Sequence, residues 1–500
     1  MKYALDSRMS KEIDRYTIEE IGTPSIVLME RAAMSVAGKC AQVAKEFNRS
    51  VRICAVCGCG NNGADGIAAA RILTWQGLEV DIIIAGNEEH ATTDFSIQKK
   101  IAVNSGMNFR NIAAIPEYDI VIDAVFGVGL KRNVEGEYGR ALEMINAPGK
   151  YVISVDVPSG IDASTGQIMN VAVRANATVT FGYNKLGLML YPGKEYAGEV
   201  TVSDIGFYPE AVKKLSSPMY FTIDDLSGIP ERIMDSNKGT YGRILVIAGS
   251  ENMSGAAFLA AKAAYRSGAG LVEIFTHENN VTALKALLPE AIITGYNEKD
   301  CETKLPEALI RAGVVLVGPG LSKSDMAKMI VKRTVDEKNV PIIIDADALN
   351  IIAEDLSILM SGNGNVIITP HIGEMSRLTG LSSYEIKRAA IDVASDFSKK
   401  YNCICVLKDA VTVASENAPG NRVYINNSGC AALAKGGSGD VLTGVIAGML
   451  SLKLEPFSAA CMGVYIHGLA GELAGSKVGM HSVLAGEVVD SIGSIINRRN

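Results

Sequence analysis

Short runs of aliphatic and β-branched residues alternate with longer amphipathic stretches along the chain. In the first half, this pattern predicts helices near 10–21, 24–47 and 65–76 and strands at 51–57, 79–85, 119–124 and 151–156. Pro24, which follows Thr23, is typical of the first position of a helix. Strands that are separated by helices predict a mostly parallel, doubly wound sheet, because parallel strands need crossover connections.

The alternating pattern is interrupted by the polar segment 213–218, which ends in proline, and then begins again. Beyond the interruption, it predicts strands at 243–248, 314–317, 341–345, 366–369 and 403–407. We therefore place a domain boundary near 215–222 and predict an α/β protein with two doubly wound domains. The two halves share the alternation but no obvious motif, so they do not read as repeats.

Length and composition agree with two domains. The chain has 500 residues, of which 48% are hydrophobic and 21% are charged, so it can bury large cores and is not disordered. Its net charge of -7, with acids and bases interleaved, lacks the basic patch that nucleic-acid binding requires. It starts without an apolar signal segment, and no run approaches the roughly 18 apolar residues of a membrane span. We expect a cytoplasmic protein.

The chain has nine cysteines, and their positions follow predicted strands. Cys54, Cys57 and Cys59 lie on and just after one strand, and Cys403 and Cys405 alternate within another. A metal site would need a second pair at ligand spacing or a nearby histidine, and the sequence offers neither. We therefore interpret the cysteines as buried free thiols.

A glycine-rich segment, 58–66, follows the first predicted strand and formally contains G-x-G-x-x-G. Such a motif between a strand and a helix is typical of dinucleotide binding, but the supporting acid should end the next strand. That strand, 79–85, carries its acids at its start, on the opposite edge of the sheet. The segment also contains Asn61, Asn62 and Asp65, which are unusual against a pyrophosphate. An ordinary dehydrogenase is therefore the weaker interpretation.

Polar residues also follow other predicted strands of the first half. Asp123 ends one strand, and Asp156 and Ser159 follow the next. Because the carboxyl ends of parallel strands converge on one crevice, Asn62, Asp123 and Ser159 can meet as hard oxygen ligands. One formal charge suits a monovalent cation better than calcium, and Asp156 can act as acid or base. The alternative is that the asparagines and Ser159 only shape turns.

In the second half, the most informative segment is Lys435-Gly-Gly-Ser-Gly-Asp440, which precedes an apolar helix. Glycines at a helix start leave free N–H donors at the positive end of the helix dipole, which favours an anion hole for a phosphoryl group. Asp440 beside it can accept a proton from an attacking hydroxyl. The alternative is a capping or first-turn acid, although so many glycines are costly for a plain cap. The segment is not a P-loop.

The first half closely resembles the NAD(P)H-hydrate epimerase domain over residues 1–215, through the segments 61–66, 123–130 and 155–162. The resemblance implies a Rossmann-like αβα sandwich and a potassium ion on Asn62, Asp123 and Ser159. It implies that the hydrated nucleotide is bound by Asn61, Asn62, Gly63, Ala64, Asp65, Gly127, Val128, Gly129, Leu130, Lys131, Arg132, Asn133, Tyr138 and Asp156. The family usually has glycine at position 64, where we expect a methyl group to crowd a close approach of the backbone.

The second half resembles the ribokinase-like superfamily through Gly-x-Gly-Asp at a helix start, residues 437–440. Over residues 222–500 it resembles the ADP- or ATP-dependent NAD(P)H-hydrate dehydratase branch, through the segments 238–242, 247–250, 318–321, 345–350, 369–371 and 435–440. This implies a ribokinase-like αβα domain that uses Mg²⁺ with ADP or ATP. It implies substrate contacts from Ala256, Gly320, His371 and Asp440, and nucleotide contacts from Lys408, Asp409, Ala410, Val411, Thr412 and Gly439.

The two resemblances imply one repair system for hydrated NADH and NADPH. Hydration puts a hydroxyl on C6 of the nicotinamide ring, in R and S forms. Phosphorylation converts that hydroxyl into a phosphate leaving group, which the lone pair of the ring nitrogen expels. A chiral site acts on one form, S in the family, and a fused epimerase supplies it. We expect Asp156 and Asp440 to be the catalytic residues, in a homo-oligomer.

Two other functions remain open from the sequence. One is a small-molecule kinase fused to a regulatory nucleotide-binding domain, which would release a stable phosphorylated metabolite. The other is a nucleotide-sensing scaffold whose first half binds a partner protein, against which the two aspartates argue. The true phosphoryl donor also stays open.

Overall fold

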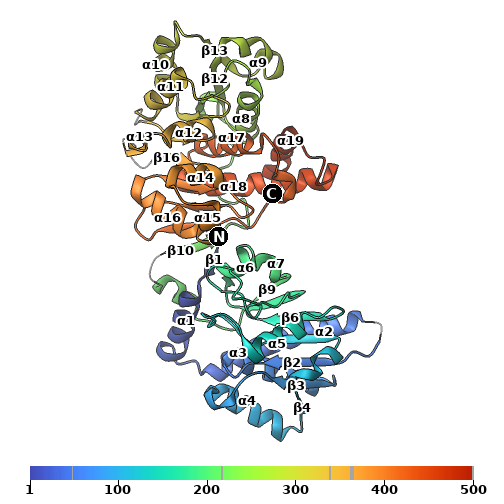
Figure 1. Ribbon diagram of the computed structural model, residues 1–500. Helices are drawn as coiled ribbons and strands as arrows, with labels where there is room; N and C mark the ends of the chain where they lie inside the picture. The colour runs from blue at the N-terminus through green and yellow to red at the C-terminus, as the bar shows by residue number, and fades with distance from the viewer. Residues whose placement is uncertain (48, 216–217, 337–338, 361–364, 498–500) are drawn as a thin grey trace. The chain divides into compact units, whose positions relative to one another are not determined.

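The computed structural model describes residues 1–47, 49–215, 218–336, 339–360 and 365–497. The chain divides into two compact units, one of residues 3–216 and one of residues 217–500 with the first two residues of the chain (Figure 1). The predicted boundary at 215–222 includes residues 216 and 217, which lie outside the described residues.

The first unit is built around a parallel sheet. Within the described residues the sheet has seven strands in the order β4-β3-β2-β5-β6-β7-β9, and each neighbouring pair is parallel. These strands are β2 (Ile53–Cys57), β3 (Val80–Ile84), β4 (Phe109–Arg110), β5 (Ile120–Ala124), β6 (Tyr151–Val155), β7 (Ala177–Phe181) and β9 (Glu199–Ser203). A separate short pair, β1 (Lys2–Leu5) and β8 (Asn184–Lys185), is also parallel.

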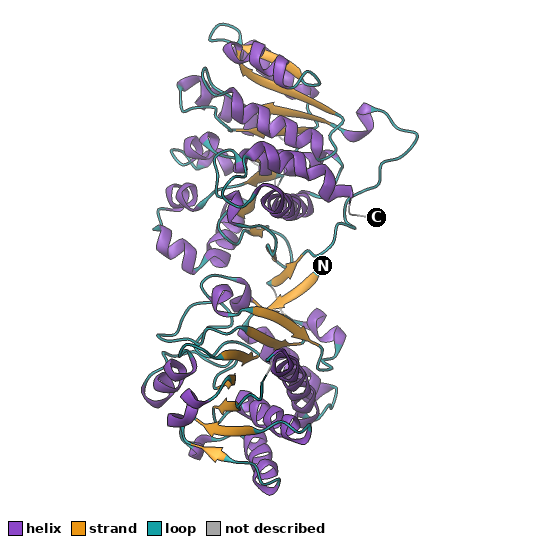
Figure 2. Ribbon diagram, turned by 90° about the vertical axis from the view of Figure 1, so that its right-hand side faces the viewer, coloured by secondary structure: helices purple, strands orange, loops and turns teal. Residues whose placement is uncertain are grey.

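Helices cover both faces of this sheet (Figure 2). They are α1 (Ser7–Arg15), α2 (Ser25–Glu46), α3 (Asn61–Trp75), α4 (Thr93–Asn104), α5 (Gly136–Ile145), α6 (Leu186–Met189) and α7 (Gly193–Tyr196). Alternate residues of β2 enter different cores, because successive side chains of a strand point to opposite faces. Ile53, Ala55 and Cys57 pack with α2 and α3, whereas Cys54 and Val56 pack with α5.

The second unit also contains a largely parallel sheet, with strands in the order β13-β12-β11-β14-β15-β16-β17-β18-β19-β10. Only the pairs β17–β18 and β18–β19 of this described series are antiparallel. The strands are β10 (Met219–Thr222), β11 (Arg243–Ile247), β12 (Leu271–His277), β13 (Ile292–Tyr296), β14 (Val314–Val317), β15 (Ile342–Ile344), β16 (Val366–Ile368), β17 (Ile404–Leu407), β18 (Val413–Ser415) and β19 (Arg422–Ile425). The prediction of two doubly wound α/β domains is confirmed.

The helices of the second unit are α8 (Ser254–Arg266), α9 (Val281–Leu287), α10 (Cys301–Arg311), α11 (Asp325–Val335), α12 (Asp347–Ile352), α13 (Ser357–Met360), α14 (Ile372–Thr379), α15 (Ser383–Arg388), α16 (Ala390–Tyr401), α17 (Ser438–Ser451), α18 (Pro456–Val478) and α19 (Ala485–Ile496). Its main core joins the sheet to α8, α17, α18 and α19. In the described ranges, no helix combines the length and apolar character that crossing a membrane requires.

The predicted strands are confirmed to within two residues at each end, but two helix starts are wrong. Helix α1 begins at Ser7 because Asp6 caps it, accepting a hydrogen bond from the Met9 amide at 2.6 Å. Helix α3 begins at Asn61, four residues before the predicted start, so the segment 61–65 is the first turn of a helix and not a loop.

Small residues allow α3 to begin directly against the sheet. A Cβ atom on Gly63 would lie 1.7 Å from the Gly58 carbonyl oxygen, and one on Gly66 would lie 2.4 Å from the Ala124 Cβ. The helix therefore approaches β2 and β5 more closely than a loop would need to. This close packing is why the glycines, which predict a loop from the sequence, lie inside a helix.

The predicted state of the cysteines is confirmed. All nine lie in the described ranges as free thiols, Cys430 half-buried and the other eight buried. Burial raises the pKa of the Cys403 thiol to about 12 and raises that of Cys405 as well. These thiols therefore stay protonated and behave as small apolar side chains.

Helix α17 packs closely against α8 through glycine. A Cβ on Gly444 would lie 2.2 Å from the Ala260 carbonyl oxygen and 2.8 Å from the Ala263 Cβ. We expect Gly444→Ala to lower the free energy of unfolding of the second unit by about 1 to 3 kcal/mol, because the helices must move apart. Chemical denaturation followed by circular dichroism measures this change.

The matched control is Gly486→Ala in α19, where an added Cβ meets nothing within 4 Å. There the helix propensity of alanine should raise the stability by up to about 1 kcal/mol. Equal effects of the two substitutions would contradict the importance of the α8–α17 packing.

Two candidate active sites

The first candidate site contains a carboxylate that is completely buried at the end of β5. Asp123 Oδ2 accepts hydrogen bonds from the Ser154 hydroxyl at 2.8 Å and the Ser159 amide at 2.9 Å, and Oδ1 accepts one from the Ser159 hydroxyl at 2.5 Å. Burial raises the pKa of Asp123, while the bonds from Ser159 and Ser154 oppose that rise. Among the described residues, no cation forms an ion pair with this carboxylate. A bound cation would compensate its charge.

Asn62, in the first turn of α3, faces the loop that follows β5. A Cβ on Gly127 would lie 2.8 Å from Asn62 Oδ1, and the Asn62 Nδ2 atom is buried without a hydrogen-bond partner. The neighbouring Phe126 amide donates to the Ser159 hydroxyl at 2.8 Å. The structure therefore gathers Asn62, Asp123 and Ser159 around one loop. Their amide, carboxylate and hydroxyl oxygens fit a cation of low charge.

Asp156 follows β6 and adopts a positive φ of 64°. Its Oδ1 atom accepts hydrogen bonds from Lys185 Nζ at 2.6 Å, the Thr180 hydroxyl at 3.0 Å and the Phe181 amide at 3.3 Å. Aspartate adopts this left-handed backbone more readily than most residues. The three hydrogen bonds hold Asp156 in this conformation. Lys185 and Thr180 were missed from the sequence. The only signal was a lysine shortly after a strongly apolar strand.

Further carboxyl groups lie close to Asp156. Burial and the charges of Asp156, Asp14 and Asp94 raise the pKa of Asp65 well above its usual value. Burial and the charges of Asp156 and Asp94 also raise the pKa of Asp14, while Lys185 opposes this rise. Asp65 was predicted as a substrate contact, whereas Asp14 was missed because no motif surrounds it. The site therefore combines groups that favour the neutral form with one that is ion-paired.

The loop predicted to bind the nucleotide, residues 127–133, lies beside an aromatic pair. The rings of Phe126 and Tyr138 are 4.9 Å apart, and a Cβ on Gly86 would lie 1.9 Å from the Tyr138 hydroxyl. Tyr138 therefore reaches across to the carboxyl end of β3. Leu130 is buried in the core, so only its backbone is placed to face a ligand.

The methyl group of Ala64 does not lie where we expected, from the sequence, that it would crowd the backbone. The residue is helical and its methyl group is fully buried in the core of α2 and α3. A positive φ is not required at this position, because Ala64 belongs to the first turn of α3. The expected crowding was therefore based on the wrong secondary structure, since the methyl group faces the core.

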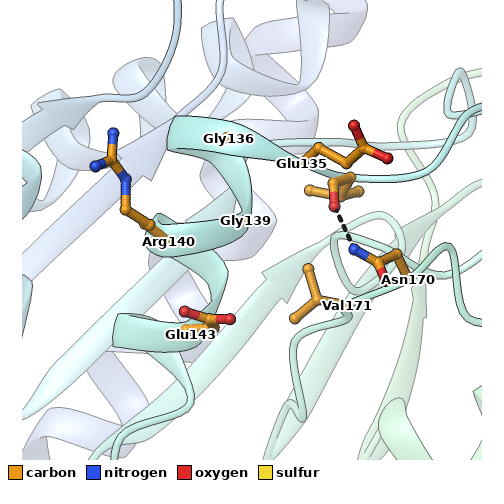
Figure 3. Close-up of a pocket in the computed structure, with 8 residues that line it drawn as sticks. Glu135, Gly136, Gly139, Arg140, Glu143, Asn170 and Val171 are labelled. Atoms are coloured by element: carbon orange, nitrogen blue, oxygen red, sulfur yellow. Dashed lines mark hydrogen bonds between the residues drawn. The ribbon is translucent and has the colours of Figure 1, made fainter.

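A separate pocket of about 450 Å³ lies at the start of α5 (Figure 3). It is lined by Val134, Glu135, Gly136, Gly139, Arg140, Glu143, Asn170 and Val171. Asn170 Nδ2 donates to the Val134 carbonyl at 3.0 Å and so closes one side of it. None of the predicted site residues lines this pocket.

The second candidate site lies where β15 and β17 end beside the start of α17. Lys408 Nζ is 2.7 Å from Asp345 Oδ1, and a Cβ on Gly439 would lie 3.3 Å from that Nζ. The Lys408 amide donates to the Pro370 carbonyl at 2.8 Å, which fixes the strand end. The structure therefore places an ammonium group directly against the glycines of the predicted anion hole. Glycine at 439 keeps this approach open.

Asp440 is the third residue of α17, after Gly437, which has a φ of 86° and caps the helix without a side chain. The interpretation of Asp440 as the capping residue is therefore wrong, although it does lie in the first turn. Burial, with the charge of Asp345, raises the pKa of Asp440 to about 6, and Lys408 opposes that rise. A carboxylate with this pKa is ionised at neutral pH and is a stronger base than an exposed one.

His371 caps α14 beside this ion pair. Its Nδ1 accepts hydrogen bonds from the Gly373 amide at 2.9 Å and the Glu374 amide at 3.3 Å. The neutral ring therefore carries its proton on Nε2, which lies 3.4 Å from Glu374 Oε1. Burial raises the pKa of Glu374 to about 7, with Lys408 opposing and Asp345 adding to the rise. The sequence contains Glu374 next to His371, but no role was predicted for it.

The other predicted contacts of the second unit are with the substrate or with the nucleotide. A Cβ on Gly320 would lie 3.2 Å from the Ala256 Cβ, so the structure brings these two substrate candidates together. In the nucleotide segment, Asp409 lies 3.6 Å from Lys387 Nζ, whereas Val411 is buried. The Val411 side chain therefore belongs to the core, and only its backbone can contact a nucleotide.

Comparison with known proteins separates the same two halves. Residues 25–187 match the family model described as YjeF-related protein N-terminus, and residues 244–494 match that described as NAD(P)H-hydrate dehydratase. A bifunctional NAD(P)H-hydrate repair enzyme of Moorella thermoacetica is 34% identical over 99% of this chain and 96% of its own length. One from Thermofilum pendens is 36% identical over 96% of this chain and 93% of its own.

Among solved structures, a ribokinase-like superfamily protein from Enterococcus faecalis is similar to the second unit. It is 27% identical, has a TM-score of 0.51, and the match covers 56% of this chain and 96% of that protein. The predicted ribokinase-like fold of the second half is therefore confirmed.

The raised pKa of Asp440 has a consequence for stability. Because the folded pKa of about 6 exceeds the ordinary 3.8, ionisation of Asp440 disfavours the folded state above pH 6. We expect Asp440→Asn to increase the free energy of unfolding at pH 7.5 by about 1 to 3 kcal/mol. The gain should shrink as the pH falls through about 6 and vanish below about 4. Denaturant titrations across this pH range measure it.

Asp355 provides a control of opposite sign in the same unit. Hydrogen bonds from Ser357 lower the pKa of Asp355, so its ionised form favours the folded state. Asp355→Asn should therefore reduce stability at pH 7.5. A stability gain for Asp440→Asn that stays constant from pH 4 to 8 would contradict the burial of an unfavourable charge.

Proposed function

The chain belongs to the family of bifunctional NAD(P)H-hydrate repair enzymes, and from this premise we propose how its two sites divide the work. The enzyme interconverts the R and S forms of hydrated NADH and NADPH, and it dehydrates the S form in a nucleotide-dependent reaction. We assign one reaction to each unit because each has its own aspartate at the end of an element. Asp156 follows a strand in the first unit, and Asp440 lies at the start of a helix in the second.

In the first unit, Asp156 exchanges a proton with the C6 hydroxyl of the hydrate. Asn62, Asp123 and Ser159 would hold a potassium ion, which supplies positive charge near the bound nucleotide. The support for the ion is the buried Asp123 carboxylate, which forms no ion pair among the described residues, and the Asn62 Oδ1 atom that faces Gly127 in the loop after β5. The loop 127–133 and Tyr138 border the same strand ends, so they are placed to contact the nucleotide.

In the second unit, Asp440 removes the proton of the C6 hydroxyl as that oxygen attacks the terminal phosphorus of ADP or ATP. Free N–H groups at the start of α17 and the Lys408 ammonium stabilise the phosphoryl group during transfer. The ring nitrogen then expels the phosphate, which is a far better leaving group than hydroxide. Mg²⁺ would accompany the nucleotide and neutralise its phosphate oxygens. The carboxylates of Asp345 and Glu374 would be its oxygen ligands from the protein.

The remaining parts of the proposal concern organisation. We assign the epimerase to residues 1–215 and the dehydratase to residues 222–500. The dehydratase consumes one epimer only, so the epimerase makes the other epimer available to it. The cytoplasmic location and the homo-oligomer stay predictions.

Paired substitutions test the assignment of the two reactions. We expect Asp440→Ala to slow dehydration by roughly 10²- to 10⁴-fold, because a general base is lost, and to leave epimer exchange intact. Asp156→Ala should slow exchange by a similar factor and leave the dehydration of pure S hydrate unchanged, because each unit has its own core. A time course that resolves both epimers by chromatography, with ADP or ATP in excess, measures both rates.

The racemic hydrate distinguishes the possible outcomes. With Asp156→Ala, recovery of reduced nicotinamide absorbance should stall once the S form is exhausted, apart from spontaneous exchange. If both epimers vanish at the wild-type rate, Asp156 is not the acid–base group of an epimerase. If either substitution abolishes both reactions, the two sites are not independent. Release of a stable phosphorylated product would instead indicate a small-molecule kinase.

The cation site gives a separate prediction. Asp123→Ala should remove the dependence of epimer exchange on potassium concentration and weaken hydrate binding to the first unit, because the only formal charge of the ligand set is lost. Asp119→Ala is the matched control, since Asp119 directly precedes the same strand at the opposite edge of the sheet and pairs with Arg49. Exchange rates in potassium titrations, with a large organic cation to keep ionic strength constant, measure the effect. Equal potassium dependence in both variants would refute the site.

A further inference from the structure

A buried ammonium group lies next to the proposed acid–base residue of the first unit. Lys185, on β8, is only 2% exposed. Its Nζ atom donates to Asp156 Oδ1 at 2.6 Å, the Thr180 hydroxyl at 2.9 Å and the Phe181 carbonyl at 2.8 Å. An ammonium group has three donors, so all of them are used. Burial of a lysine is costly, and such complete pairing is what makes it tolerable.

Among the described residues, the hydrogen bonds to the Asp156 carboxylate all reach the same one of its two oxygens. Lys185, Thr180 and the Phe181 amide all donate to Oδ1. The backbone of Asp156 is held at a positive φ, and the residue is 8% exposed. One carboxylate oxygen is therefore anchored in the protein, which leaves Oδ2 as the oxygen available to a substrate.

The other charged groups around Asp156 are carboxyl groups. The charges of Asp14 on α1 and Asp65 on α3 interact with that of Asp156, and Asp94 on α4 acts on both of them. Like charges at close range disfavour a further carboxylate. Lys185 supplies the opposite charge in direct contact. Its removal would leave Asp156 buried among carboxyl groups without an ion pair.

We propose that Lys185 is the positioning residue of the epimerase site, fixing Oδ1 of Asp156 and pairing with that carboxylate so that Oδ2 can accept a proton. The inference rests on the proposed role of Asp156 in epimer exchange. It adds the direction of the proton transfer, because an ion-paired carboxylate is a base. Asp65, which lies near the start of α3 and whose charge interacts with that of Asp156, is the neighbour that can donate a proton, since burial raises its pKa.

This division yields a balanced exchange reaction. Asp156 removes the proton of the C6 hydroxyl, a C6=O double bond forms, and the C6–N1 bond breaks with its electron pair going to N1. Asp65 gives its proton to N1. The open aldehyde rotates, N1 attacks its other face, and both protons return to the groups from which they came. No oxidant, reductant or second substrate is needed.

The test compares the pH dependence of exchange in variants of the full-length chain. Pure R hydrate is incubated without nucleotide, and its conversion to S is followed by chromatography from pH 5 to 9 with spontaneous exchange subtracted. Lys185→Met should slow exchange at pH 7 by roughly 10- to 100-fold. It should also move the acidic limb of the profile to higher pH by about one unit or more, since Asp156 loses its counter-charge. Lys185→Arg, which keeps the charge, should keep the limb near its wild-type position.

Two further variants separate charge from structure. Thr180→Val removes one hydrogen bond from Asp156 but keeps the ammonium, so its limb should stay in place. Lys100→Met removes an exposed lysine of α4 and should leave exchange unchanged. Thermal unfolding of each variant shows whether the first unit is folded at the pH values used.

The outcomes are distinct. If Lys185→Met slows exchange without moving the limb, or Lys185→Arg behaves like Lys185→Met, Lys185 is only structural and the inference is overturned. An unchanged rate in Lys185→Met also overturns it. If the wild-type chain itself does not exchange the epimers, it is the proposed function that fails. The inference is supported if the acidic limb of the pH profile moves to higher pH in Lys185→Met and stays near its wild-type position in Lys185→Arg.

Discussion

Parallel strands end at the same edge of their sheet, and both sites depend on this constraint. In the first unit, β2, β5 and β6 bring Asn62, Asp123 and Asp156 to one edge although long helices separate them in the sequence. In the second unit, β15 and β17 bring Asp345 and Lys408 together across more than sixty residues at a distance of 2.7 Å. The crossover helices return the chain to the opposite edge, so that successive strands run parallel. The residues that follow these strands therefore meet at one edge of the sheet.

The two sites treat a buried carboxylate differently. Asp156 contacts an ammonium directly, at 2.6 Å from Lys185. Burial and the charge of Asp345 raise the pKa of Asp440 to about 6, and the Lys408 ammonium opposes that rise. The two arrangements differ in what surrounds the carboxylate. One is set by an ion pair and the other by a balance between burial and two neighbouring charges. The two units thus hold their proposed catalytic carboxylates by different routes.

Glycine and alanine make these arrangements possible. Gly63 and Gly66 let α3 begin against the strand ends, so Asn62 reaches the loop after β5. Gly439 leaves room for the Lys408 ammonium at the start of α17, and Gly444 lets the same helix pack on α8. A side chain at Gly63 or Gly66 would push α3 away from the sheet, one at Gly444 would push α17 away from α8, and one at Gly439 would crowd the Lys408 ammonium. The polar groups would then be too far apart to cooperate.

The alternation of apolar runs determined the fold class, the positions of the strands and the edge at which function gathers, because these depend on local periodicity and on parallel topology. The sequence also singled out Asp156, Asp440 and the glycines before α17. It could not show that residues 61–65 form a helix, since glycine favours loops in isolation and only close packing against β2 and β5 makes a helix the better solution. Nor could it reveal Lys185, Asp14 or Glu374 as members of the sites. Lys185 and Asp14 lie in segments without a motif, and Glu374 follows a motif in which no role was predicted for it. The role of each comes from charges brought near it by chain segments distant in sequence. Burial and Coulomb interactions are properties of the folded arrangement, so only the tertiary structure decided which carboxyl groups carry a proton.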